Sequence, residues 1–157
     1  VNNKTNLQKA LHLITKQRLL SNERIALHIS CHGNEKGITL TSKESILWGE
    51  LRNMLIEFAK DANAYHNTAK ISTIILCMSS CFGLNAKAMA KNEGSPFLSL
   101  IAPTQKVSWS DSLASFLVFY NLFLNKGKQL SDIIGPMNLA AGIKDLFQIL
   151  DLSNDLK

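Results

Sequence analysis

The sequence lacks an apolar run long enough to cross a membrane. Its longest apolar stretch, residues 113–124, is interrupted by Ser115 and Asn121, whereas a spanning helix needs about 20 apolar residues. Residues 2–6 are polar, and no apolar segment of the kind found in a secretory signal peptide follows them. We therefore expect no membrane partner and a cytoplasmic location.

Charge is also sparse and has no concentrated block. Charged residues make up 18% of the 157 residues and hydrophobic residues 46%. This is the composition of a packed globular chain, and the length fits one domain over residues 1–157. The net charge is +5, but the lysines are scattered and no block of about five or six basic residues occurs, so nucleic acid is not an expected partner.

Three further features that the sequence lacks limit the kinds of site that we expect. The cysteines number only three, an odd count, and without a signal segment they do not predict a disulfide framework. No Cys-x-x-Cys pair occurs, which disfavours a zinc site built from Cys31, His32, Cys77 and Cys81. No glycine-rich phosphate loop follows a strand, which disfavours a nucleotide-binding domain. We expect no metal and no organic cofactor.

The pattern of apolar residues predicts an α/β fold. Nearly continuous apolar runs predict buried strands at residues 24–31, 71–78 and 97–102, and a short hairpin is expected over 38–41 and 45–48. Helices are expected at residues 5–20, 49–63, 84–91, 110–125 and from 131 towards 152, the last disturbed at Gly135-Pro136. Ser110 or Asp111 is expected to cap the fourth of these. Strands alternating with helices imply a mainly parallel sheet with helices on both faces.

Two of the predicted strands end in residues that can carry chemistry. One ends at His32-Gly33 and another at Cys81-Phe82-Gly83, with Cys81 49 residues after His32. Sites in open α/β sheets form beyond the carboxyl ends of the strands, so the imidazole and the thiol are expected to meet at one sheet edge. A nearby base makes a thiol more reactive, which makes Cys81 the candidate nucleophile and His32 its partner. The backbone N–H groups of Gly33 and Cys81 are candidate donors to the oxyanion of an acyl intermediate.

The other conspicuous residues are interpreted as structural. Cys77 alternates with Met78 inside its strand and is expected to pack in the core. Cys31 directly precedes His32, so on a strand its side chain points to the opposite face. His28 alternates with apolar neighbours and is expected to be a satisfied, buried or half-buried histidine.

Residues 27–33, Leu-His-Ile-Ser-Cys-His-Gly, and residues 75–83, Ile-Leu-Cys-Met-Ser-Ser-Cys-Phe-Gly, resemble the His-Gly strand and the catalytic cysteine turn of caspases and the related CHAT peptidases. Residues 107–111, 119–120 and 125–127 are similar to the segment that CHAT domains carry after the cysteine, so the resemblance covers about residues 24–140. It implies a caspase-like sandwich of helices around a mainly parallel sheet. It also implies a cysteine endopeptidase that cleaves a protein substrate through Cys81 and His32. A regulatory domain or partner protein, in a larger bacterial protein or defence system, is the setting that this resemblance implies.

The chain departs from that family in two respects. Ser79-Ser80 stands where caspases usually have Gln-Ala, although Gly83 is retained, and the chain opens on a helix where the family has sheet strands. Either the sequence begins inside the domain or another segment completes that edge of the sheet. These departures keep a second hypothesis open, a catalytically inactive caspase-like binding module.

The segment after the third core strand bears on substrate preference. Caspases carry Ser-Trp-Arg there, and the arginine pairs with a substrate aspartate; this chain has Ser108-Trp109-Ser110, followed by Asp111. Trp109, Ser110 and Asp111 are the candidate substrate-binding residues, with Trp109 as an apolar wall. Cleavage after Asp or Glu is not expected. If Asp111 lies near the site, we expect cleavage after Arg or Lys, because a carboxylate pairs well with guanidinium or ammonium. An uncharged preference and a purely capping role for Asp111 stay open.

Overall fold

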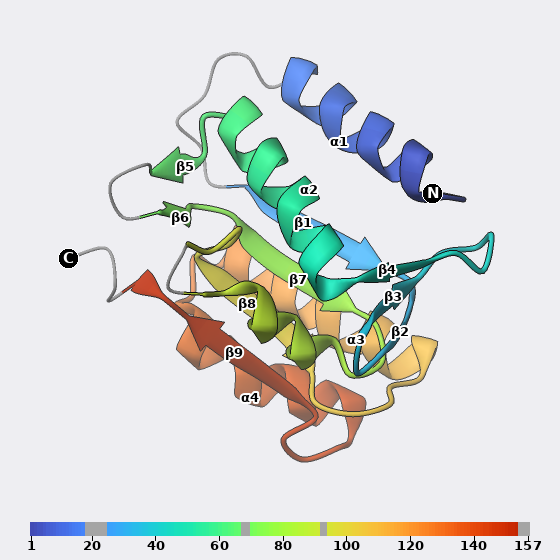
Figure 1. Cartoon of the computed structure of the whole chain (residues 1–157). Coiled ribbons are helices and arrows are strands. Elements are labelled where there is room, and N and C mark those ends of the chain that lie inside the picture. Colours follow the sequence, from blue (N-terminus) through green and yellow to red (C-terminus); the bar gives the residue numbers. More distant parts are fainter. Residues whose placement is uncertain (18–24, 67–69, 92–93, 154–157) are drawn as a thin grey trace.

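A four-stranded sheet forms the centre of the computed structural model, which describes residues 1–17, 25–66, 70–91 and 94–153 (Figure 1). The strand order is β1-β7-β8-β9; the first three strands run parallel, and β9 is antiparallel to β8. Their bounds are β1 (Ala26–Ser30), β7 (Ile75–Ser79), β8 (Ser99–Pro103) and β9 (Phe147–Asp151). The chain is therefore mixed α/β with a mainly parallel sheet, as predicted.

Helices cover both faces of this sheet (Figure 1). One face carries α1 (Lys4–Gln17), α2 (Trp48–Asp61) and the 3-10 helix η1 (Gly83–Met89); the other carries α3 (Trp109–Tyr120), its π-helical extension η2 (Asn121–Asn125) and α4 (Leu130–Ala141). Every residue of β7 is buried: Leu76 and Met78 lie in the core under α2, whereas Ile75 and Cys77 pack with α3 and α4. Successive strand residues point to opposite faces, so covering both faces requires the continuous apolar run seen in the sequence.

The three predicted core strands belong to one sheet. The prediction over 24–31 corresponds to β1, although residue 24 lies outside the described residues, and 97–102 corresponds to β8. Residues 71–78 divide into β7 and a short β6 (Ile71–Ser72), which pairs with β5 (Tyr65–His66). The predicted hairpin is present as β3 (Gly37–Thr39) and β4 (Ser45–Leu47). The sequence did not predict that residues 32–34 form a third strand of that small sheet, β2 (His32–Asn34), paired with β3.

The prediction of a helical region continuing towards residue 152 is wrong. Helix α4 passes through Gly135-Pro136 and stops at Ala141, where Gly142 takes a left-handed conformation with φ 68°. Glycine adopts this conformation without a steric penalty and commonly ends helices in this way. Residues 147–151 then pair with β8 as an antiparallel edge strand whose Phe147 is buried.

The predicted cap of α3 is also wrong. The helix begins at Trp109, and its N-cap is Ser108, whose Oγ accepts a hydrogen bond from the Asp111 N–H at 3.1 Å. Ser110 and Asp111 lie inside the first turn. Because the helix starts earlier than expected, the side chain of Asp111 is not used as the cap, and a role for this carboxylate outside the helix stays open.

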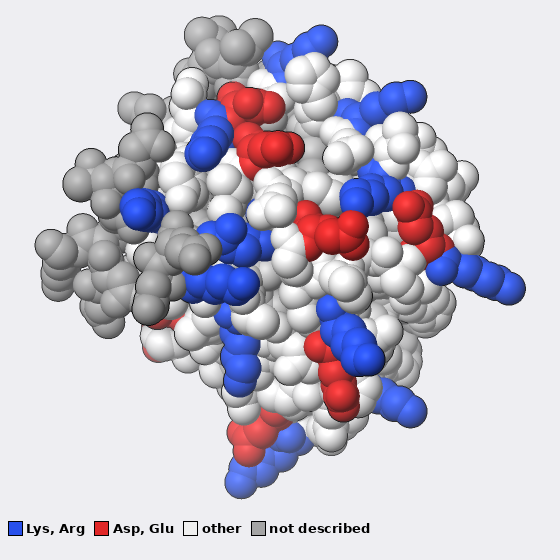
Figure 2. Space-filling view, viewed as in Figure 1, with Lys and Arg blue, Asp and Glu red and all other residues white. Residues whose placement is uncertain are grey.

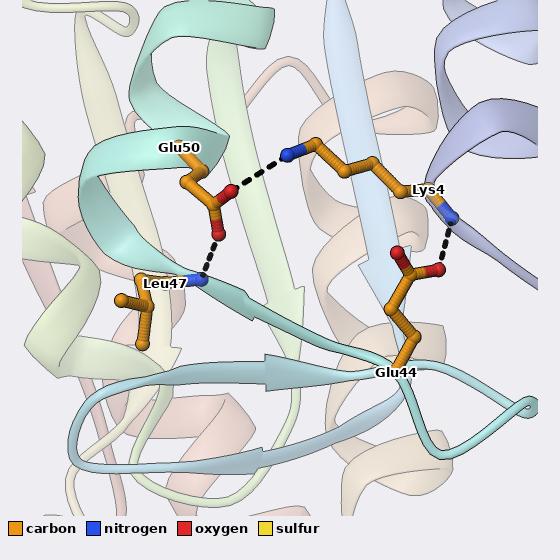
Figure 3. A network of polar contacts seen from close by, with 4 residues as sticks. All are labelled: Lys4, Glu44, Leu47 and Glu50. Carbon is orange, nitrogen blue, oxygen red and sulfur yellow. Dashed lines mark hydrogen bonds and ion pairs between the residues drawn. The ribbon is translucent and has the colours of Figure 1, made fainter.

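A small polar network fixes the start of α1 against the hairpin and α2 (Figure 3). The Lys4 N–H donates to Glu44 Oε2 at 2.8 Å, and the Lys4 ammonium lies 2.6 Å from Glu50 Oε1. Glu50 Oε2 accepts from the N–H of Leu47, at the start of α2. The hydrogen bond and charge of Lys4 lower the pKa of Glu50. These contacts hold the hairpin, which in turn pairs with the strand that carries His32.

Two features of the surface bear on partners. No helix in the described ranges is both long and apolar enough to traverse a bilayer. On the face drawn in Figure 2, acidic side chains lie among the lysines and arginines, in keeping with the scattered charges of the sequence.

Candidate active site

The sheet brings the His32 and Cys81 segments to the same edge. Strands β1 and β7 are parallel neighbours in register from Ala26↔Ile75 to Ser30↔Ser79. Both strands therefore end at the same level, and the N–H of Cys31 still donates to the carbonyl of Ser79 at 3.3 Å. Immediately beyond that bond, β1 leads into His32-Gly33 and β7 leads into Ser80-Cys81.

Strand β2 touches the Cys81 turn at Gly33. A Cβ placed on Gly33 would lie 2.6 Å from the carbonyl oxygen of Cys81 and 3.1 Å from the Cβ of Ser80. Real Cβ atoms do not approach a backbone oxygen as closely as 2.6 Å, so only glycine fits this contact. The backbone of Gly33 and that of Cys81, the two expected oxyanion donors, thus belong to a strand and a turn that are in direct contact.

Cys81 lies in a tight turn that is also contacted by residues 105–107. The turn is closed by the N–H of Gly83, which donates to the Ser80 carbonyl at 3.0 Å, and Phe82 has a left-handed φ of 56°. The N–H of Phe82 donates to the carbonyl of Gln105 at 3.0 Å. The thiol of Cys81 is half-buried and donates to the carbonyl oxygen of Val107, with Sγ 3.7 Å from the oxygen.

His32 is exposed, and its ring meets Trp109. The two ring centroids are 5.7 Å apart at an interplanar angle of 69°, an edge contact. Among the residues that the structure describes, no hydrogen bond joins His32 to Cys81. The predicted pair thus lies at one edge of the sheet, where Cys81 contacts Val107 just before α3 and His32 contacts Trp109, the first residue of α3.

The two serines that precede Cys81, Ser79 and Ser80, have different environments. Ser79 Oγ lies 2.5 Å from Ser112 Oγ, and both residues are buried, so this bond ties the end of β7 to α3. Ser80 is 1% exposed and packs between the two glycines, 3.2 Å from the ideal Cβ position of Gly33 and 3.1 Å from that of Gly83. Its hydroxyl has no partner within the described part of the chain.

The other two cysteines are placed as structural residues. Cys77 is 0% exposed, and burial raises the pKa of its thiol to about 12. Cys31 is half-buried against the core beneath α2, and burial raises its pKa to about 11. His28 is satisfied by the hydroxyl of Tyr120, 2.7 Å from its Nδ1, and burial lowers the pKa of its imidazole.

These environments predict selective alkylation of one thiol. At pH 8, a thiol with a pKa of about 11, such as Cys31, is thiolate in about one molecule in a thousand, and only the thiolate reacts. We expect iodoacetamide to modify Cys81 in the folded protein well before Cys31 or Cys77, as measured by peptide mass spectrometry. Unfolding in guanidinium should make all three react at similar rates. Modification of Cys77 ahead of Cys81 in the folded protein would contradict the assignment.

The three expected substrate-binding residues, Trp109, Ser110 and Asp111, differ in exposure and in contacts. Trp109 is 54% exposed beside His32. Ser110 Oγ is 2.8 Å from Ser108 Oγ, and Asp111 is half-buried in the first turn of α3. Sequence reasoning missed Gln105 and Val107, which contact the cysteine turn through backbone carbonyls; any residue type supplies a carbonyl, so no sequence signal could have marked them.

Across the described residues, no group of three or more His, Cys, Asp or Glu side chains is arranged to hold a metal ion. The functional groups at the carboxyl ends of β1 and β7 include the Cys81 thiol, the His32 imidazole and backbone N–H groups. No protein-family model and no curated protein matches the sequence.

Proposed function

We propose that the protein is a caspase-like cysteine endopeptidase, with Cys81 as nucleophile and His32 as its acid–base partner. The observation that carries this proposal is the contact between His32-Gly33 of β2 and the Ser80-Cys81 turn, at the carboxyl ends of β1 and β7. A thiol and an imidazole held on adjoining segments at one edge of a sheet form the pair that thiol-based acyl transfer requires. The resemblance of residues 27–33 and 75–83 to caspases and CHAT peptidases supports the same reading. With it we propose a cytoplasmic setting and a regulatory domain or partner protein.

The reaction follows from these groups. The sulfur of Cys81 attacks the carbonyl carbon of the substrate peptide, and the thiol proton passes to His32. The negative charge on the carbonyl oxygen is stabilised by the N–H groups of Gly33 and Cys81. The C–N bond then breaks, the amine takes the proton from His32, and a thioester remains on Cys81. Water attacks the thioester, giving one proton to His32, which returns it to the sulfur as the acid product leaves.

One observation favours the alternative, a binding module without activity. The Cys81 thiol donates to Val107, and His32 packs on Trp109. In a pseudoprotease, these contacts would be the permanent state of the site, and this part of the surface would bind protein without cleaving it.

A panel of peptidyl acyloxymethyl ketones separates the two functions. A peptidase should be labelled at Cys81 by the best of these electrophiles, and His32→Ala should slow labelling by about 10²-fold or more, the range of general acid–base effects. Mass spectrometry of the intact protein and of its peptides gives the rate and the position. Labelling at the same rate in His32→Ala, or no labelling by any member of the panel, would favour the binding module.

The position of Asp111 leads to a prediction about selectivity. It lies two residues after Trp109, and its side chain is not needed to cap α3, since Ser108 does so. If the Asp111 carboxylate reaches the bound substrate, we expect peptide-library cleavage after Arg or Lys, because a carboxylate pairs with a cation. Asp111→Asn, which keeps the shape of the side chain, should lower that preference by about tenfold, the effect of losing roughly 1.4 kcal/mol of charge-assisted hydrogen bonding. Dominant cleavage after Asp would overturn the assignment. Unchanged selectivity in Asp111→Asn would mean that the Asp111 carboxylate does not bind substrate.

A further inference from the structure

A single segment, residues 105–109, contacts both members of the proposed catalytic pair. The Val107 carbonyl accepts the thiol hydrogen of Cys81, and the Trp109 ring lies against the ring of His32. The segment is fixed on both sides of these contacts: the Gln105 carbonyl accepts from the N–H of Phe82, and Ser108 caps the first turn of α3. The Cys81 thiol and the His32 imidazole thus both contact residues 105–109, although the backbone segments that carry them are in contact with each other.

We infer that Trp109 is a positioning residue that, together with the Val107 carbonyl, holds His32 apart from Cys81 until a peptide substrate engages residues 105–109. This inference rests on the proposed peptidase function and concerns the regulation of that site. The conformation of the structure is then the resting state, and the substrate assembles the dyad that cleaves it.

Both holding contacts are of a kind that a peptide can replace. A thiol is a weak hydrogen-bond donor, and a peptide N–H is a stronger one. An extended substrate that donates to the Val107 carbonyl would therefore release the Cys81 thiol. Trp109 is 54% exposed, so an apolar substrate side chain can reach its ring without any prior rearrangement of the core.

The indole also has another apolar surface available when it leaves His32. Leu113 lies one helical turn further along α3 and is 62% exposed. Side chains four residues apart on a helix are neighbours, so the ring of Trp109 can pack on Leu113. The exchange needs only a rotation of the Trp109 side chain, while α3 stays in place.

Alkylation of Cys81 by iodoacetamide tests the inference, because this reagent carries no recognition elements and reports the resting site. In the wild type, the rate should hardly depend on His32. Trp109→Ala should raise it by about tenfold, a modest part of the effect of general-base assistance, and the increase should vanish in the Trp109→Ala/His32→Ala double variant. Trp109→Phe, which keeps a ring against His32, should behave like the wild type. Leu117→Ala is the matched control, because Leu117 is an exposed apolar residue further along the same helix, and this variant should leave the rate unchanged.

The outcomes separate failure of this inference from failure of the proposed function. Suppose that Trp109→Ala leaves the iodoacetamide rate unchanged or lowers it, while peptidyl ketones still label Cys81 in a His32-dependent way. The proposed peptidase function is then supported, and the positioning role of Trp109 is contradicted. If no reagent gives His32-dependent labelling in any variant, both the function and the positioning role are contradicted.

A fluorescence measurement checks the ring contact without relying on reactivity. Trp48 and Trp109 are the two tryptophans, so in Trp48→Phe the emission comes from Trp109 alone. Because the imidazole lies against the Trp109 ring, the emission of this variant should change when His32→Ala is added. In Trp48→Phe/Cys81→Ala, saturation with a peptide from the library screen should make the emission insensitive to His32→Ala. A difference that persists with bound peptide would show that Trp109 stays on His32 and would overturn the inference.

Discussion

Replacing Cys81 by alanine is expected to abolish peptide hydrolysis and leave the fold intact. The side chain is half-buried, and its one hydrogen bond, a weak thiol donation to Val107, can be lost at little cost to stability. The other two thiols, Cys31 and Cys77, pack against the core, where burial raises their pKa values. His32→Ala should lower kcat/KM by about 10²–10⁴-fold, the usual contribution of a positioned acid–base residue. Steady-state kinetics on a peptide from the library screen give the activity, and circular dichroism with thermal unfolding gives the integrity of the fold.

Cys77→Ala is the control for this prediction. Cys77 is 0% exposed in the core between β7 and α3, so losing its sulfur should cost about 1 kcal/mol of unfolding free energy, as for one buried methylene group. Its activity should stay near that of the wild type. A folded Cys77→Ala protein without activity, beside an active Cys81→Ala protein, would mean that the nucleophile is assigned to the wrong thiol.

The parts of the fold that sequence predicted are those fixed by burial on both faces. Residues 75–79 are all buried, and the continuous apolar character of Ile-Leu-Cys-Met-Ser fits a parallel strand that is covered on both faces. The positions of His32 and Cys81 at one edge follow from parallel pairing alone, because parallel neighbours end at the same side.

The errors occurred where tertiary contacts override local pattern. Residues 147–151 follow a helical region without any strong turn signal other than Gly142, and they form a strand because β8 offers a free edge for pairing. The cap of α3 was misplaced by two or three residues because Ser108, Ser110 and Asp111 are all good capping residues, and only the fold decides among them. Contacts through carbonyls, such as those of Gln105 and Val107, are independent of side-chain identity.

Gly33→Ala is expected to impair both stability and catalysis, because the contact between the two turns leaves no room for a methyl group. The added Cβ would lie 2.6 Å from the carbonyl oxygen of Cys81, a backbone atom that cannot rotate away. The turns must separate, which should cost about 1–3 kcal/mol of unfolding free energy, as overpacking does. It should also lower kcat/KM by about 10²-fold, the effect of moving reacting groups by about 1 Å.

Gly49→Ala is the matched substitution at a glycine with free space. An added Cβ on Gly49 meets nothing within 4 Å, and the residue lies in the first turn of α2. The change should leave kcat/KM unaltered and raise the unfolding free energy by up to about 1 kcal/mol, since alanine loses less backbone entropy than glycine in a helix. Urea unfolding and peptide kinetics on both variants give the comparison. If Gly33→Ala matched Gly49→Ala in stability and activity, the His32 and Cys81 turns could not be in contact, and the observation that carries the peptidase proposal would be lost.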